Sequence, residues 1–230
     1  MMIESIANFR DAGGLPSRFG GIVRSGLLYR CGLPADVDAE DLERIIAMDF
    51  ALIADLRYPA EQEKEPSRWP LEWEERILAY SGTSDQTAPH TKMLRDGTLN
   101  EQGSREAYQQ IYRVVPFDDE YLNTFGQMMA ALAEGRGPML VHCSAGKGRT
   151  GMAVALIHHA LGVPEDELYA NFLLSNESPG LHAMAEGVRE RVKENFGHEF
   201  SPELMRHIIG VEASYLDAFF DELRQRCGST

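Results

Sequence analysis

The sequence predicts an α/β fold with a central, mostly parallel sheet of about four to five strands, flanked by helices and followed by a helix-rich C-terminal part. Two observations carry this prediction. Short apolar runs alternate with helical patterns through the first two-thirds of the chain, and helical patterns alone fill the last third. The 230 residues, 43% hydrophobic and 25% charged, fit one soluble domain over residues 1–230.

The first half of the chain carries most of the expected strands. Alternation in residues 21–30 (GIVRSGLLYR) indicates short strands or a hairpin. Residues 38–50 (DAEDLERIIAMDF) have apolar side chains at helical spacing behind an acidic first turn, which a helix dipole favours. Residues 50–57 (FALIADLR) form an apolar run that ends in polar residues, as buried parallel strands do, and residues 76–81 (RILAYS) indicate another strand.

Residues 81–103 (SGTSDQTAPHTKMLRDGTLNEQG) form the most loop-like segment of the chain. Loops of this length are uncommon unless they are functional or mobile. Two interpretations stay open: a lid over a functional site, or a flexible insertion.

The second half of the chain is dominated by helical patterns around one further strand. The apolar run at residues 138–143 (PMLVHC) predicts a buried strand, and residues 149–163 (RTGMAVALIHHALGV) predict a helix covered on several sides. The other helices are expected at residues 104–115, 118–135, 165–174, 182–197, from 201 onward, and at 211–226.

Charge and composition exclude several classes of function. A net charge of −14 argues against nucleic acid or an anionic membrane as a partner. No run approaches the roughly 18–20 apolar residues that span a bilayer, so we expect no integral membrane segment. The first residues lack a signal-peptide pattern, which favours a cytoplasmic protein, or one exported without such a signal.

The cysteines and histidines give no sign of a metal or a disulfide framework. Cys31, Cys143 and Cys227 are few and scattered, and neither a CxxC nor an HExxH pattern occurs. We therefore expect no metal and no cofactor.

The stretch 141–151 (VHCSAGKGRTG) carries the chemistry. A strand is expected to end at His142 and a helix to begin near Arg149, with a glycine-containing loop between them. Such a loop can turn its amides inward as an anion-binding nest, and the helix N-terminus adds to its positive potential. The guanidinium of Arg149 suits two phosphate oxygens at once. The pattern predicts binding of a tetrahedral oxyanion such as phosphate.

The same positive potential acts on Cys143. At a helix N-terminus beside cations, the pKa of a cysteine thiol can fall to about 3.5–7.5, which makes it a thiolate nucleophile. A small buried hydrophobe is the alternative reading, and the spacing to Arg149 disfavours it. Thr150 could bond to the sulfur, and His142 is placed to orient the loop. The expected reaction is attack of sulfur on phosphorus, with a phosphocysteine intermediate that water hydrolyses without a metal.

HCSAGKGRT resembles the HCxxGxxR[ST] signature of cysteine-dependent protein tyrosine phosphatases. Four further segments are similar to the bacterial tyrosine/serine and lipid phosphatase branch, which includes secreted virulence phosphatases. They are NFRDAGGL (8–15), VRSGLLYRCGLP (23–34), ADLRYPAE (54–61) and ALGVPEDELYANFLLSN (160–176). The resemblance covers most of the chain except residues 69–103, and implies a protein tyrosine phosphatase-like fold.

The resemblance assigns roles to the central stretch. It implies that Cys143 is the nucleophile and Arg149 the phosphate clamp. The residues implied to bind phosphate beside Arg149, through loop amides, are Ser144, Ala145, Gly146, Lys147 and Gly148.

The proton donor to the leaving group stays open, because loops of this branch usually read GKDR and their aspartate is credited with acid–base work. Gly148 stands at that position here. Asp55 could be the general acid or the partner of Arg149. Asp118 and Asp119 could be acids, although helix capping is favoured for them. A good leaving group could also depart with water alone.

Two further sets of residues carry weaker expectations. Lys147 could bind a second phosphate of the substrate, as in a phosphoinositide, or pair with a carboxylate of the fold. Asn8, Arg10 and Asp11, in the motif NFRDAGG, are expected to support the site rather than touch substrate.

The function predicted is metal-independent hydrolysis of phosphomonoesters, on phosphotyrosine and also phosphoserine/threonine in proteins. One alternative is a phosphoinositide phosphatase, so the expected partner is a phosphoprotein or phospholipid. The lipid reading is weakened because residues 81–103 offer only His90, Lys92 and Arg95 as basic groups. The other alternative, motivated by Gly148, is a catalytically impaired phosphoprotein-binding module.

Overall fold

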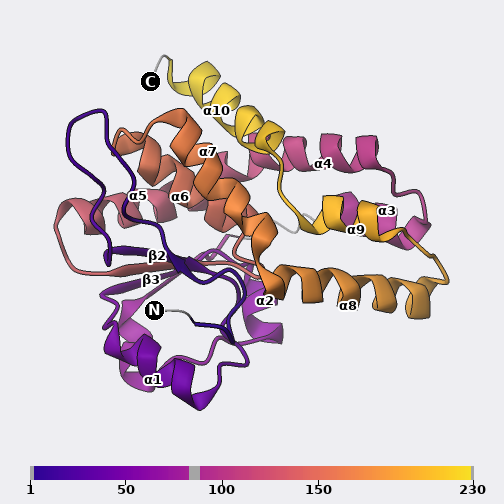
Figure 1. Ribbon diagram of the computed structural model, residues 1–230, viewed down its shortest axis with the longest axis horizontal. Coiled ribbons are helices and arrows are strands. Elements are labelled where there is room, and N and C mark those ends of the chain that lie inside the picture. The colour runs from indigo at the N-terminus through magenta and orange to yellow at the C-terminus, as the bar shows by residue number, and fades with distance from the viewer. Residues whose placement is uncertain (1–2, 83–88, 229–230) are drawn as a thin grey trace.

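A five-stranded sheet lies at the centre of the molecule, as the sequence predicted (Figure 1). The computed structural model describes residues 3–82 and 89–228. The strand order is β1-β2-β5-β3-β4, with β1 antiparallel to β2 and every other neighbouring pair parallel. The strands are β1 Arg10–Asp11, β2 Leu28–Cys31, β3 Leu52–Asp55, β4 Ile77–Ala79 and β5 Met139–His142.

The carboxyl ends of the three central strands lie level with one another. His142 of β5 is opposite Cys31 of β2 and Asp55 of β3 in the parallel register. The segments that follow these strands therefore meet at one edge of the sheet, where ligands bind in open α/β sheets.

The two faces of the sheet bury different cores. Along β5, Met139 and Val141 join the larger core, whereas Leu140 joins the smaller one, because successive strand side chains point to opposite faces. The larger core includes residues of α5 and α6, and the smaller one includes Ile45 of α1. Figure 1 shows α1 on the opposite side of the sheet from α5, α6 and α7.

The helices match most of the expected ranges. They are α1 Ala39–Ala47, α2 Pro59–Lys64, α3 Pro89–Asp96, α4 Glu101–Val114, α5 Asp119–Ala133, α6 Gly148–Ala160, α7 Glu165–Leu173, α8 Pro179–Phe196, α9 Pro202–Ile209 and α10 Ala213–Cys227. Three 3₁₀ turns, η1 Leu71–Arg76, η2 Val115–Phe117 and η3 Leu174–Glu177, connect some of them.

Two expectations need correction or remain open. In residues 21–30 only the end is a strand, because Gly20, Gly21 and Gly26 adopt positive φ and turn the chain. Within 81–103, residues 89–96 form α3 and residues 101–103 begin α4, whereas 83–88 lie outside the described residues. A role as a lid or flexible insertion stays a prediction.

Helices α3, α4, α8 and α9 form a layer beside the sheet domain (Figure 1). α9 contacts both α4 and α8. Over the residues that the structure describes, no helix is both long and apolar enough to cross a membrane.

Candidate active site

The loop between β5 and α6 wraps around the start of α6 and is shaped by one glycine. Gly146 adopts a φ of +66°, and a Cβ built on it would lie 2.3 Å from the carbonyl carbon of Cys31. Only glycine fits this close approach of the loop to the end of β2. The loop therefore lies at the carboxyl edge of the sheet, with α6 beginning at Gly148.

Side chains from the N-terminal segment and β2 hold the outside of the loop. Asn8 donates from Nδ2 to the Gly146 carbonyl oxygen at 2.6 Å, and Arg30 donates from Nη2 to the same oxygen at 2.8 Å. Arg10 in turn donates to the carbonyl oxygen of Asn171 at 2.9 Å, and Asp11 accepts from the backbone N–H of Gly13 at 2.7 Å. These contacts agree with the supporting role expected for the NFRD motif.

Arg30 is a contributor that the sequence analysis did not single out. It is 1% exposed and lies on the face of β2 toward α6, where its guanidinium binds the loop from behind. A buried arginine inside a strand is a rare pattern, and this was the available signal.

Cys143 lies at the base of the loop with 3% of its surface exposed. Burial alone would raise the pKa of the thiol, but Arg149 and hydrogen bonds from Thr150 and the Gly146 amide outweigh it, so the pKa is lowered. The Thr150 hydroxyl is buried and has no oxygen or nitrogen partner among the described residues, which leaves it to the sulfur. The surroundings of the thiol thus favour the thiolate.

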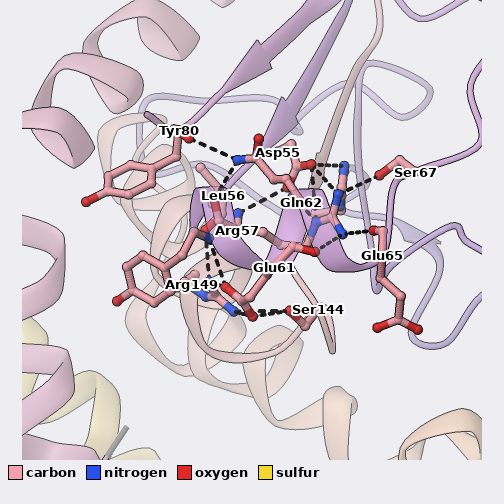
Figure 2. Close-up of polar contacts among 12 residues, drawn as sticks. Asp55, Leu56, Arg57, Glu61, Gln62, Glu65, Ser67, Tyr80, Ser144 and Arg149 are labelled. Atoms are coloured by element: carbon pink, nitrogen blue, oxygen red, sulfur yellow. Dashed lines mark hydrogen bonds and ion pairs between the residues drawn. The ribbon is translucent and has the colours of Figure 1, made fainter. Parts of the chain in front are cut away.

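Arg149 is held by Glu61 of α2, as Figure 2 shows. Its Nη2 donates to Glu61 Oε1 at 2.9 Å, and its Nη1 donates to the other carboxylate oxygen. The hydroxyl of Ser144 donates to the same carboxylate. Burial would raise the pKa of Glu61, but Arg149 and Ser144 lower it to about 2. Glu61 therefore stays charged and fixes both the clamp and the loop.

Aromatic rings complete the surroundings of Arg149. Its guanidinium lies 4.9 Å from the centre of the Tyr58 ring, and its Nη1 donates to the Leu56 carbonyl oxygen at 3.2 Å. Planar guanidinium groups stack well on aromatic faces, which further restricts the rotamers of Arg149.

Asp55 does not pair with Arg149, which corrects one of its two expected roles. It binds Arg57 instead, with Nε donating to Oδ1 at 2.9 Å and Nη2 to Oδ2 at 2.6 Å (Figure 2). The reason is strand alternation: Asp55 points to the same face as Ile53, in the smaller core, whereas α6 covers the other face. Burial raises the pKa of Asp55, but His142 and Arg57 lower it overall, so it is ionised at neutral pH.

His142 lies beside Asp55 below the loop. Its Nε2 is 3.7 Å from Asp55 Oδ2, and its ring is fully buried against Trp69. Burial lowers the pKa of His142, so the ring is neutral. Among the described residues neither ring nitrogen has a hydrogen-bond partner, and the ring acts here by packing.

Asp118 is the N-cap of α5, as the sequence analysis favoured. Its Oδ1 accepts from the Glu120 backbone N–H at 3.1 Å and from the Tyr80 hydroxyl at 3.0 Å. Asp119 is exposed in the first turn of the same helix.

Lys147 has neither of the partners expected for it. Its ammonium donates to the carbonyl oxygens of Ile208, Ile209 and Gly210 at 2.9, 2.5 and 3.2 Å. It also lies 5.2 Å from the centre of the Tyr108 ring. The last carbonyls of α9 attract a cation because a helix C-terminus is negative. Burial lowers the pKa of Lys147 to about 7.

A thiol with a lowered pKa, inside a loop at a helix N-terminus and beside a fixed guanidinium, defines a cysteine-dependent phosphatase site. The chain belongs to the tyrosine phosphatase family, whose model matches residues 1–230. It is thus a cysteine-dependent enzyme that hydrolyses phosphotyrosine through a phosphocysteine intermediate.

Two relatives match nearly the whole chain. A candidate tyrosine-protein phosphatase of Cupriavidus necator, H16_A0669, is 34% identical over 222 residues, which cover 95% of this chain and 76% of that protein. The triple specificity protein phosphatase PtpB of Mycobacterium tuberculosis is 29% identical over 252 residues, which cover 96% of this chain and 88% of PtpB.

Among solved structures, the chain matches Pseudomonas aeruginosa TpbA at 15% identity and a TM-score of 0.32, over 88% of this chain and 89% of that one. A cysteine-to-serine variant of TpbA in complex with phosphotyrosine matches at 14% identity and a TM-score of 0.33, over 97% and 99%. Likeness at this level adds nothing to the family assignment.

Proposed function

We propose that Cys143 is the nucleophile of this phosphatase and that Arg149 clamps the transferring phosphoryl group. The observation that carries the proposal is the lowered pKa of Cys143 inside the loop that Arg149 closes. The sulfur forms a bond to phosphorus as the ester bond breaks, and the leaving oxygen takes a proton. Water then attacks phosphorus, the S–P bond breaks, and inorganic phosphate leaves as the thiolate returns.

The loop supplies most of the charge stabilisation in this proposal. With the Gly146 carbonyl bound from outside by Asn8 and Arg30, the amides face inward, where three equatorial phosphoryl oxygens would lie. The proposed amide donors are Ser144, Ala145, Gly146, Lys147 and Gly148. Thr150 supports the sulfur, and His142 supports the loop from below.

The proposed substrates are phosphotyrosine and also phosphoserine/threonine in proteins. The name of PtpB, a triple specificity phosphatase, supports a range wider than phosphotyrosine. A phosphoinositide headgroup is the second candidate on the same ground, but the binding of Lys147 to α9 removes the cation expected to favour it. The net charge of −14 also opposes approach to an anionic membrane surface.

A cytoplasmic reaction is part of the same proposal. The three cysteines are free, and none forms a disulfide. This is what supports a reducing compartment.

The proposal is tested by hydrolysis of an aryl phosphate in the presence of a chelator. Wild type should turn over, and Cys143→Ser should lose turnover while still binding phosphate. Cys227→Ser is the matched control, because Cys227 is exposed at the end of α10 and should leave the rate unchanged. Wild type that binds phosphopeptides but hydrolyses no phosphomonoester would support a binding module instead.

A further inference from the structure

The hydroxyl of Tyr112 is buried without a hydrogen-bond partner among the described residues. Tyr112 lies on α4 with 2% of its surface exposed, and its ring packs edge-on against Phe172 at 6.2 Å and against Tyr215 at 5.4 Å. Buried hydroxyl groups are normally bonded, because leaving one unpaired costs free energy. An unpaired one calls for an explanation.

The hydroxyl faces the one loop position that lacks a side chain. A Cβ built on Gly148 would lie 3.4 Å from Tyr112 Oη, and its next neighbours would be Cε2 and Cζ of the same ring at 4.0 Å. A 3.4 Å separation is ordinary van der Waals contact, so a side chain fits here. Whatever stands at position 148 therefore points first toward α4.

Tyr112 is suited to donate to such a side chain. Burial, followed by the nearby tyrosines and Cys143, raises the pKa of Tyr112 well above its usual value, so the hydroxyl keeps its proton across the working range. Arg30 is the cation that acts electrostatically on Tyr112 from β2, and Cys143 is the thiol that does so from the loop. The Arg30 guanidinium would also tolerate a carboxylate nearby.

We propose that position 148 and Tyr112 form a positioning pair that attaches the phosphate loop to α4, and that position 148 is not a source of protons for the reaction. In this chain the pair is open, because Gly148 offers no acceptor. The substitution of glycine for the aspartate usual in such loops therefore leaves proton transfer intact, and the enzyme is not impaired by it. This inference rests on the proposed function only for its kinetic part.

The structural part is tested by thermal unfolding of a double-mutant cycle: wild type, Y112F, G148D, and both together, with G148A as the control for adding a Cβ. In the wild-type background Y112F should leave the Tm unchanged or raise it, because it removes an unpaired hydroxyl. In the G148D background the same change should lower the Tm by about 2–4 °C or more, because it removes the donor to the new carboxylate.

If G148D fails to fold, G148N replaces it in the same cycle, since the asparagine amide oxygen accepts from Tyr112 without adding charge. Equal effects of Y112F in both backgrounds would overturn the proposal, because they would show that residue 148 does not bond to Tyr112.

The kinetic part is tested with a series of phosphomonoesters that differ in leaving-group pKa. The slope of log kcat/KM against that pKa should be the same for wild type and G148D, whatever the absolute rates. A shallower slope in G148D, with a selective gain on alkyl phosphates, would make residue 148 a proton donor and overturn the proposal. Failure of the proposed function has another signature: wild type would hydrolyse no member of the series, while the unfolding cycle would be unaffected.

Discussion

At the scale of single residues, Glu61 is the group on which the clamp depends. Its carboxylate binds the Arg149 guanidinium through both oxygens and also accepts from the Ser144 hydroxyl. The bond therefore spans α2, the loop and α6, and it selects one rotamer of Arg149 before substrate arrives. A clamp fixed in advance lowers the reorganisation needed in the transition state.

We expect Glu61→Gln to lower kcat/KM for an aryl phosphate about 10- to 100-fold, the loss of one charged hydrogen bond. Glutamine keeps the shape and can still accept from Ser144, but it holds the guanidinium without charge. Glu63→Gln, an exposed neighbour on α2, is the control. Equal rates for the two variants would show that Arg149 finds its position without Glu61.

Asp118 supports a second prediction at this scale. Because asparagine caps helices as well as aspartate does, Asp118→Asn should change neither the stability nor the dependence on leaving-group pKa. Asp118→Ala should lower the free energy of unfolding by about 0.5–2 kcal/mol. Chemical denaturation and the same series of esters measure both effects, and a steeper leaving-group dependence in Asp118→Asn would identify Asp118 as the acid.

At the scale of elements, strand alternation explains what the sequence could and could not predict. The apolar runs ending at Asp55 and His142 correctly located β3 and β5, and the glycines after Cys143 correctly located the loop. Whether Asp55 or a residue of α2 would reach Arg149 depended on which face of β3 was turned toward α6. An apolar run buried on both faces carries no signal for that choice.

Helix α9 is joined to the loop in a way that sequence spacing could not foresee. Lys147 and Ile208 are distant in the sequence, yet the ammonium binds the last carbonyls of α9. A buried lysine beside a loop predicted to bind phosphate suggested an anionic partner, whereas neutral carbonyls at a helix end supplied the same attraction. Lys147 thus joins the phosphate loop to the outer layer of helices.

We expect Lys147→Met to lower the free energy of unfolding by about 1–2 kcal/mol, because it leaves the α9 carbonyls without their cation. Chemical denaturation measures this, with Lys193→Met as the control for an exposed lysine of α8. If Lys147 instead served a second phosphate of the substrate, its loss would spare stability and lower activity selectively on phosphoinositides.

At the scale of the whole molecule, the sheet and α6 hold ionisable groups in the core. His158 of α6 is 1% exposed, and its Nε2 lies 2.8 Å from the Ala12 carbonyl oxygen. Burial lowers the pKa of His158 from 6.5 to about 4, so the folded protein binds this proton less readily than the unfolded chain. The charge of −14 indicated solubility, but nothing in it indicated a neutral histidine in the core.

Acid should therefore destabilise the protein first through His158. The stability that this group contributes is present above pH 6.5 and is lost as the pH falls toward 4, by about 3 kcal/mol at most. Glu61, with its pKa lowered from 4.5 to about 2, adds a loss only below pH 4.5. In denaturant titrations His158→Gln should flatten the dependence between pH 6.5 and 4, whereas the exposed His182→Gln should not.

The fold and family were accessible from the sequence because strand, loop and helix at residues 138–163 carry local signals. The attachments of the loop to Asn8, Arg30 and Glu61 were less accessible, since each comes from a distant segment. Only the packed sheet brings those segments to one edge.

The central claim is that the loop and Arg149 keep the Cys143 sulfur ionised at neutral pH. The most direct measurement is the pH dependence of Cys143 alkylation, followed in a Cys227→Ser background so that the exposed thiol does not contribute. The account predicts a midpoint clearly below the ordinary value of 9.0, moving upward in Arg149→Met. A midpoint at or above 9.0, unchanged by the loss of Arg149, would contradict it.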